Sequence, residues 1–132
     1  MNDPSLPSDL ALVNDELGRR RFTPDVYFDS GKDDLSDDAR DKLAGNAELL
    51  NGQSQFNIII EGHADSRGTG EDNLALGERR AAATKDYLHS LGVAAHRMRT
   101  VSYGDQRPVC TEETEDCWAQ NRRAHMVITG RG

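Results

Sequence analysis

Residues 62 to 81 read GHADSRGTGEDNLALGERRA, and this stretch leads from an apolar run, through a Gly- and Asp-rich loop, into a long helix. Apolar side chains recur along the helix at three- and four-residue steps, at Leu76, Ala83, Tyr87, Leu88 and Leu91. At about 100° per residue, Arg80 falls in the middle of this apolar face, whereas Arg79 points to solvent. The pattern therefore predicts an arginine turned toward the core, near the loop that carries Asp65.

An arginine in this position requires an anion, because a lone charge turned toward a core is strongly destabilising unless it is paired. One hypothesis is a structural ion pair between Asp65 and Arg80. The other is a binding site in which the two residues hold opposite ends of a zwitterion, the ammonium at Asp65 and the carboxylate at Arg80. The second hypothesis requires a cleft that leads to the guanidinium.

Composition limits the classes of function. Charged residues make up 30% of the 132 residues and the mean hydropathy is -0.74, which predicts a soluble chain. The formal net charge of -7 argues against a nucleic acid or an anionic membrane as partner, because phosphate binding needs clustered Lys and Arg. No apolar run is long enough to span a bilayer, and the residues after Met1 do not resemble a signal peptide.

Hydrophobic periodicity predicts an N-terminal tail with a short helix over residues 1–23 and one folded domain over residues 24–130. The elements expected in the domain are strands at 25–29, 56–61, 97–103 and 122–129, and helices at 36–50 and 71–91. Ser36 is the expected N-cap of the first of these helices, and Gly92 is expected to end the second. This order predicts a two-layer α/β fold with right-handed crossovers and the helices on one face of the sheet.

Several separate motifs follow one another between Val26 and Ile128. They are GHAD at 62–65, RGT at 67–69, Asn73 with Leu76, RRA at 79–81, YL at 87–88, LG at 91–92, VSYG at 101–104 and WAQNRR at 118–123. Together they resemble the OmpA-like peptidoglycan-binding domain, and most closely its peptidoglycan-associated lipoproteins. The resemblance implies a four-stranded mixed sheet with helices on one face. It also implies a non-enzymatic domain without cofactor or metal that binds peptidoglycan.

The resemblance further implies that Asp65 and Arg80 hold the meso-diaminopimelate of the peptidoglycan stem peptide, which favours the ligand hypothesis over the ion pair. The other residues expected at this ligand are Leu76, Thr69, Ser30 and Gly31. Family members commonly carry Phe-Asp or Asn at the positions of Ser30 and Gly31. This chain therefore lacks a side-chain contact there, and only backbone groups are expected to close the pocket.

The resemblance also implies a location and partners. The domain would tether the outer membrane, or an envelope complex, to the cell wall from the periplasm, and work with the Tol system, whose periplasmic β-propeller competes for an overlapping surface. Family members are anchored through an acylated N-terminal Cys, and no Cys precedes Cys110 here. Two alternatives stay open. One is an interaction domain of a Tol-type or stator-type complex with weakened wall binding; the other is a metal-assisted hydrolase that uses His63 and Asp65.

Cys110 and Cys117 flank a hydrophilic loop, and they are either free thiols or a disulfide. The periplasmic location that the resemblance implies favours the disulfide. Trp118, beside this loop, is interpreted either as a packing side chain or as a platform for a sugar. Strand alternation in the last strand predicts that Arg122 forms a structural pair and that Arg123 is exposed.

Overall fold

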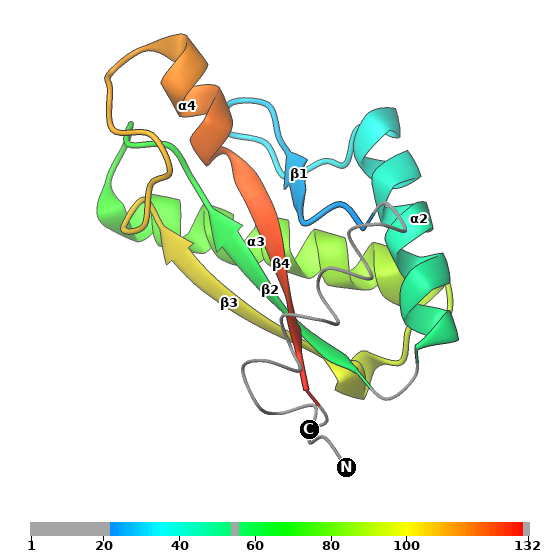
Figure 1. Cartoon of the computed structure of the whole chain (residues 1–132). Helices are drawn as coiled ribbons and strands as arrows, with labels where there is room; N and C mark the ends of the chain where they lie inside the picture. The colour runs from blue at the N-terminus through cyan, green and yellow to red at the C-terminus, as the bar shows by residue number, and fades with distance from the viewer. Residues whose placement is uncertain (1–21, 54–55, 131–132) are drawn as a thin grey trace.

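The computed structural model describes residues 22–53 and 56–130, and the strands in this part form one mixed sheet (Figure 1). The strands are β1 (Asp25–Tyr27), β2 (Asn57–His63), β3 (Met98–Gly104) and β4 (Arg123–Thr129). They lie in the order β1-β4-β2-β3, with β4 antiparallel to both of its neighbours and β2 parallel to β3. The predicted four-stranded mixed sheet is confirmed. The helix expected within residues 1–23 lies outside the described residues.

Two long helices, α2 (Asp37–Gly52) and α3 (Gly70–Ser90), pack on one face of the sheet. In Figure 1, α3 crosses behind the strands and α2 lies beside β1. The hydroxyl of Ser36 accepts a hydrogen bond from the backbone N–H of Ala39 and so caps α2 as predicted. Gly92, with φ of 101°, turns the chain after α3 and leads into a short 3-10 helix, η1 (Ala95–Arg97).

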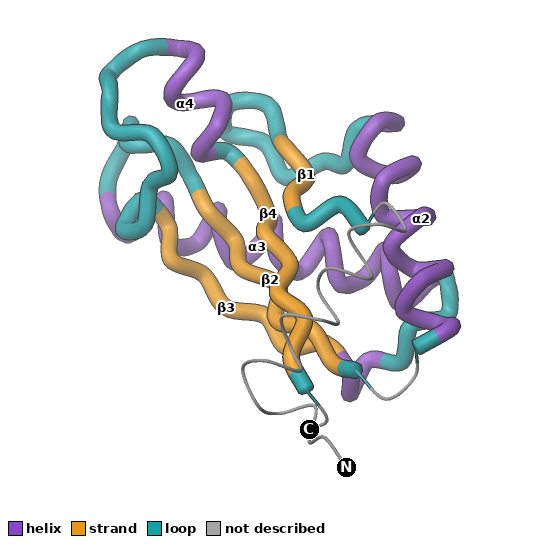
Figure 2. Tube along the Cα trace, viewed as in Figure 1, coloured by secondary structure: helices purple, strands orange, loops and turns teal. Residues whose placement is uncertain are grey.

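The sequence patterns do not predict a further helix, α4 (Glu115–Asn121), which begins in the last two residues of the predicted hydrophilic loop and continues past Cys117 (Figure 2). The hydroxyl of Thr114 accepts a hydrogen bond from the backbone N–H of Cys117, and Glu115 and Asp116 occupy the first turn, where the helix dipole favours carboxylates. Seven residues are too few for an apolar periodicity to show. The cap and the two carboxylates are the signals that identify this helix.

The core lies between the sheet and the two long helices. Its members on β2 and β4 alternate as predicted, and they are Ile58, Ile60, Ala124, Met126 and Ile128. They pack against the inner faces of the helices, at Leu43, Ala47, Leu50, Ala81 and Leu88. Leu91, expected on this face, is instead 37% exposed because α3 ends at Ser90 and the chain turns away.

Two residues of the predicted N-terminal tail, Phe22 and Thr23, contact the domain. Phe22 packs against the core. The side-chain amide of Asn46, fully buried on α2, donates to the carbonyl of Thr23 at 2.7 Å and accepts from its N–H at 2.8 Å. One amide side chain thus satisfies both backbone groups of Thr23 and fixes the start of β1 against α2.

The closest approach of β2 to α3 is made by two glycines. A Cβ added to Gly62 would overlap the carbonyl oxygen of Gly77, which belongs to the helix backbone and has no room to shift. We therefore expect Gly62→Ala to lower the free energy of unfolding by about 2–3 kcal/mol, as for an overpacked core. Urea denaturation measures this change.

Gly45→Ala provides the matched control, because Gly45 lies on the exposed face of α2 and an added Cβ meets nothing within 4 Å. This substitution should stabilise the protein by about 0.5–1 kcal/mol, since alanine favours a helix over glycine. Equal effects of the two substitutions would contradict the proposed close approach.

Candidate functional site

The residues that the sequence singles out meet at one end of the sheet. Because β1, β2 and β3 run in the same direction, their C-terminal ends lie together there. The β1–α2 loop, the start of α3 and helix α4 lie at the same end (Figure 1). Ligands in open α/β sheets bind preferentially at this edge.

A pocket of about 230 Å³, here called the Asp65 pocket, opens at this edge. Its lining residues are Ser30, Gly31, Ala64, Asp65, Arg67, Gly68, Asn73 and Leu76. The fold therefore brings together four of the six predicted ligand-binding residues, from the β1–α2 loop, the end of β2 and α3. Thr69 does not line the pocket; its hydroxyl accepts from the N–H of Asp72 and caps α3.

Arg80 has no exposed surface, so the inward orientation predicted from helix periodicity is confirmed. Its guanidinium donates to three backbone carbonyls: Nε to Lys32 at 2.8 Å, Nη1 to His63 at 2.9 Å and Nη2 to Asp29 at 3.0 Å. The structural ion pair with Asp65, the first of the two hypotheses, is not formed, because that carboxylate is bound by other arginines. Carbonyl dipoles, and not a carboxylate, surround the charge.

Burial lowers the pKa of Arg80 to about 10, although the nearby charge of Asp65 favours the protonated form. The side chain therefore remains a cation at neutral pH. Arg80 does not line the Asp65 pocket, so the expected cleft to its guanidinium is not found there. Two of its carbonyl partners come from the β1–α2 loop, which covers the position where an external acid was expected.

The carboxylate of Asp65 is ionised, and both of its oxygens accept hydrogen bonds from Arg67. Its Oδ1 accepts from the backbone N–H of Arg67 at 2.9 Å and from Nε of Arg67 at 3.2 Å, and its Oδ2 accepts from Nη2 at 2.8 Å. Nη1 of Arg122 lies 3.7 Å from Oδ2. Burial tends to raise the pKa of Asp65, but the hydrogen bonds from Arg67 and the charges of Arg67 and Arg122 outweigh it and hold the pKa below its ordinary value.

Helix α4 and the preceding loop contact the Asp65 pocket through Trp118. The guanidinium of Arg67 lies 4.3 Å from the centre of the Trp118 ring, and Nε1 of Trp118 donates to Oγ of Ser66 at 3.2 Å. Ser66 in turn donates to the carboxylate of Glu113 at 3.0 Å. Trp118 therefore holds the Arg67 turn in place, which neither interpretation of this residue anticipated.

The two arginines at the start of β4 differ from the prediction in one respect. Arg122 forms the expected structural pair, with Nη2 2.9 Å from Glu115, and its Nε donates to the carbonyl of Phe28. The prediction that Arg123 is exposed is wrong: it is only 7% exposed, and its Nε lies 3.2 Å from Asp25. The pairing of β1 with β4 places that carboxylate beside it.

Cys110 and Cys117 form a disulfide, as predicted. The bond closes the loop that carries Glu113 and joins it to α4. Asn121, at the end of α4, holds the same loop, because its Oδ1 accepts from the N–H of Val109 and its Nδ2 donates to the carbonyl of Cys110. The disulfide and this amide together position the loop and helix that contact the Asp65 pocket.

Removing the disulfide with the double substitution Cys110→Ser, Cys117→Ser is expected to lower the free energy of unfolding by about 2.5 kcal/mol. The value follows from the entropy of closing so short a loop in the unfolded chain. Urea denaturation of the double variant measures it, and a reducing agent should destabilise the wild-type protein to a similar extent. The same agent should leave the double variant unchanged; a shift there would show that its effect does not come from this bond.

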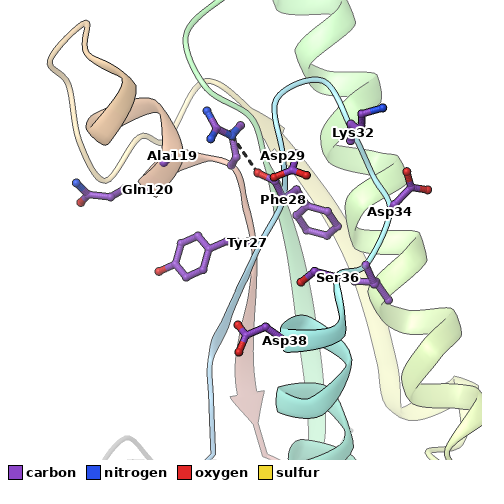
Figure 3. A pocket seen from close by; sticks show the side chains of 11 residues that line it. Tyr27, Phe28, Asp29, Lys32, Asp34, Ser36, Asp38, Ala119 and Gln120 are labelled. Carbon is purple, nitrogen blue, oxygen red and sulfur yellow. Dashed lines mark hydrogen bonds between the residues drawn. The ribbon is translucent and has the colours of Figure 1, made fainter.

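A larger cavity, about 560 Å³, shares the β1–α2 loop as a wall (Figure 3). Tyr27 and Gln120 border it on one side, and Ser36 and Asp38 at the start of α2 border it on the other. None of the six predicted ligand-binding residues lines this cavity. Despite its smaller volume, the Asp65 pocket is therefore the candidate site, because the ionised carboxylate and the GHAD motif lie there.

Within residues 22–53 and 56–130, no three His, Cys, Asp or Glu side chains gather in a way that would hold a metal ion. His63, considered as a metal ligand, is 2% exposed, with Nε2 3.2 Å from Glu61 and its ring against Tyr103. Burial, together with the charge of Arg123, lowers the pKa of His63. In the same part of the chain, the helices are too short or too polar to cross a bilayer.

Comparison with known proteins places this arrangement in a family. A model of the OmpA family matches residues 27–122. The chain belongs to the OmpA family. Its motifs at the Asp65 pocket, from Ser30 to Leu76, all fall within the matched range.

Relatives of this OmpA-family chain carry a consistent name. It is 51% identical over 107 residues to the peptidoglycan-associated lipoprotein of Brucella melitensis, covering 81% of this chain and 64% of that protein. It is 44% identical over 114 residues to the peptidoglycan-associated lipoprotein of Pseudomonas aeruginosa, covering 86% and 67%. The chain thus spans 64% of the length of the first of these relatives.

Solved structures show the same fold. The crystal structure of the peptidoglycan-associated lipoprotein from Burkholderia pseudomallei superimposes with a TM-score of 0.79 at 41% identity, covering 81% of this chain and 91% of that one. The C-terminal domain of Helicobacter pylori MotB superimposes with a TM-score of 0.76 at 17% identity, covering 83% and 86%. The second comparison shows a shared fold alone.

Proposed function

We propose that this OmpA-family domain binds peptidoglycan non-covalently and ties an envelope structure to the cell wall, without enzymatic activity. Membership of the family and the names of the relatives support the proposal. The observation that carries it is the Asp65 pocket, where an ionised carboxylate lies in a cavity next to polar groups of Ser30 and Gly31. A pocket of this kind suits the end of a peptide side chain that carries an ammonium group.

The ligand is proposed to be the meso-diaminopimelate of an uncrosslinked stem peptide. Asp65 would accept its ammonium, Leu76 would contact its methylene chain, and the backbone at Ser30 and Gly31 would face its carboxylate. Arg80 is fully buried and three of its five N–H groups donate to carbonyls, so it is not proposed to contact the ligand. The role expected from sequence is direct contact with the ligand's carboxylate. We instead propose that the charge of Arg80 attracts this carboxylate electrostatically, across the β1–α2 loop.

Two experiments test this function. Purified protein should co-sediment with isolated sacculi from a wall that contains diaminopimelate. Isothermal titration with the tripeptide L-Ala-γ-D-Glu-meso-diaminopimelate should give saturable heat. Absence of both signals at millimolar peptide would contradict wall binding and favour the alternative, an interaction domain of an envelope complex. The reason for this alternative is Gly31, which has no side chain to contact the ligand.

The same family relationship supports proposals for location and partners. We propose a periplasmic location with attachment to the outer membrane through a lipid anchor; the relatives are named as lipoproteins. The Tol system's periplasmic β-propeller is the proposed protein partner. It would compete with stem peptide, so adding it should release the domain from sacculi.

A further inference from the structure

Arg67 already occupies the carboxylate that the proposed ligand needs. Both oxygens of Asp65 accept hydrogen bonds from the Arg67 side chain, so the pair is bidentate. The Asp65 side chain is only 9% exposed. An ammonium group that enters the pocket must therefore displace the guanidinium of Arg67 before it can reach the carboxylate.

The Arg67 side chain is able to leave. It is 40% exposed at the rim of the pocket, and its other contacts are the Oγ of Ser30 at 3.0 Å and the face of the Trp118 ring. The guanidinium makes both contacts while it is bound to Asp65, so the ring and the hydroxyl are able to hold it after the carboxylate is released. Release of the side chain breaks one partly buried ion pair and leaves the backbone N–H of Arg67 on Asp65.

The charges around Asp65 determine which ligands make this exchange favourable. Arg122 lies 3.7 Å from Asp65 and is shared with Glu115, and Arg80 is buried nearby without a carboxylate of its own. A ligand that brings only an ammonium leaves Arg67 without a partner beside these two cations. A ligand that also brings a carboxylate replaces the broken pair with two new ones.

We propose that Arg67 is a specificity-determining residue, which makes the Asp65 pocket select a zwitterionic end group over a plain amine. The inference rests on the proposed function and extends it to a residue outside the predicted site. Either ligand must displace Arg67 from Asp65, which costs binding free energy. Only the zwitterion recovers this cost, because its carboxylate forms a new ion pair with Arg67.

Two peptides that differ by one carboxylate test the proposal: L-Ala-γ-D-Glu-meso-diaminopimelate and L-Ala-γ-D-Glu-L-Lys. Wild-type protein should bind the first more tightly. Arg67→Gln should raise the affinity for the lysine peptide about two- to fivefold, because the ion pair between Arg67 and Asp65 no longer has to be broken. The ratio of the affinity for the diaminopimelate peptide to that for the lysine peptide should fall by about the same factor, because only the zwitterion gives the wild-type Arg67 a new pair in place of the one with Asp65.

Arg79→Gln is the matched control. It removes the same charge from an exposed site on α3, where Arg79 pairs with Asp33 outside the pocket, and it should leave the ratio of the two affinities unchanged. Arg67→Lys retains a cation and should retain the wild-type ratio. Melting temperatures of all variants establish that they are folded.

An Arg67→Gln variant that changes both affinities by the same factor would overturn the proposal and leave the proposed function standing, because it would show that Arg67 only supports the pocket. Wild-type protein that binds neither peptide would overturn both.

Discussion

Arg80→Met is expected to lower the free energy of unfolding by about 3–5 kcal/mol. Methionine has a similar length but no donors, so the carbonyl of His63, which is buried, and the carbonyls of Asp29 and Lys32, whose bonds are partly buried, each lose a hydrogen bond. An unsatisfied buried acceptor costs about 1–3 kcal/mol, and one such loss together with two partly buried ones gives the expected range. Urea denaturation followed by circular dichroism measures the change.

Arg79→Met, one position earlier on α3, removes the same charge from an exposed side chain whose partner is Asp33 at 3.2 Å. That variant should lose about 0.5 kcal/mol or less. If Arg80→Met instead kept its stability and lost peptide binding, Arg80 would be a direct ligand contact, as expected from sequence. The pair of variants thus separates a residue that holds the β1–α2 loop from one that contacts the ligand.

Asp65→Asn is expected to weaken binding of the diaminopimelate tripeptide by about tenfold to 150-fold. The substitution keeps the shape of the side chain and removes its charge, and a hydrogen bond to a charged group contributes about 1.5–3 kcal/mol. Isothermal titration measures the loss, and retention on sacculi should fall in parallel. Because its pKa is held below the ordinary value, Asp65 stays ionised at mildly acidic pH, and wild-type binding should weaken only below about pH 4.

The control for this variant is Asp33→Asn, which changes the net charge equally. Asp33 belongs to the same β1–α2 loop but does not line the Asp65 pocket, and its ion pair with Arg79 is exposed. Binding by Asp33→Asn should stay within about twofold of the wild type. Equal losses in both variants would mean that the overall charge of the domain, and not Asp65, governs binding.

The orientation of Arg80 could be predicted from sequence because it depends only on local helix geometry. Its partners could not. The carbonyls of Asp29 and Lys32 lie 51 and 48 residues away along the chain, and every residue has a carbonyl, so no side-chain pattern marks them. The same limit applies to the site: the GHAD motif indicated Asp65, but the pairing of Asp65 with Arg67 depends on how the turn between them folds.

The error at Arg123 has a similar origin. Alternation along β4 places Arg123 on the face opposite to Ala124 and Met126, and it predicts exposure wherever that face of the sheet meets solvent. Asp25, on the neighbouring strand, lies on the same face as Arg123 and pairs with it. Only the order of strands in the sheet reveals this neighbour, and that order does not follow from periodicity.

The place of β4 in the sheet has a consequence for how the polypeptide acquires its structure. β1 pairs with β4 alone among the described strands, through partners such as Asp25 and His125 that are 100 residues apart. Such distant pairings slow folding, because a long segment loses conformational entropy before any stabilising contact forms. Among the described strands, β1 leaves the ribosome first and cannot pair until β4, the last of them, has been made. Chaperones have access to the unfolded chain until then.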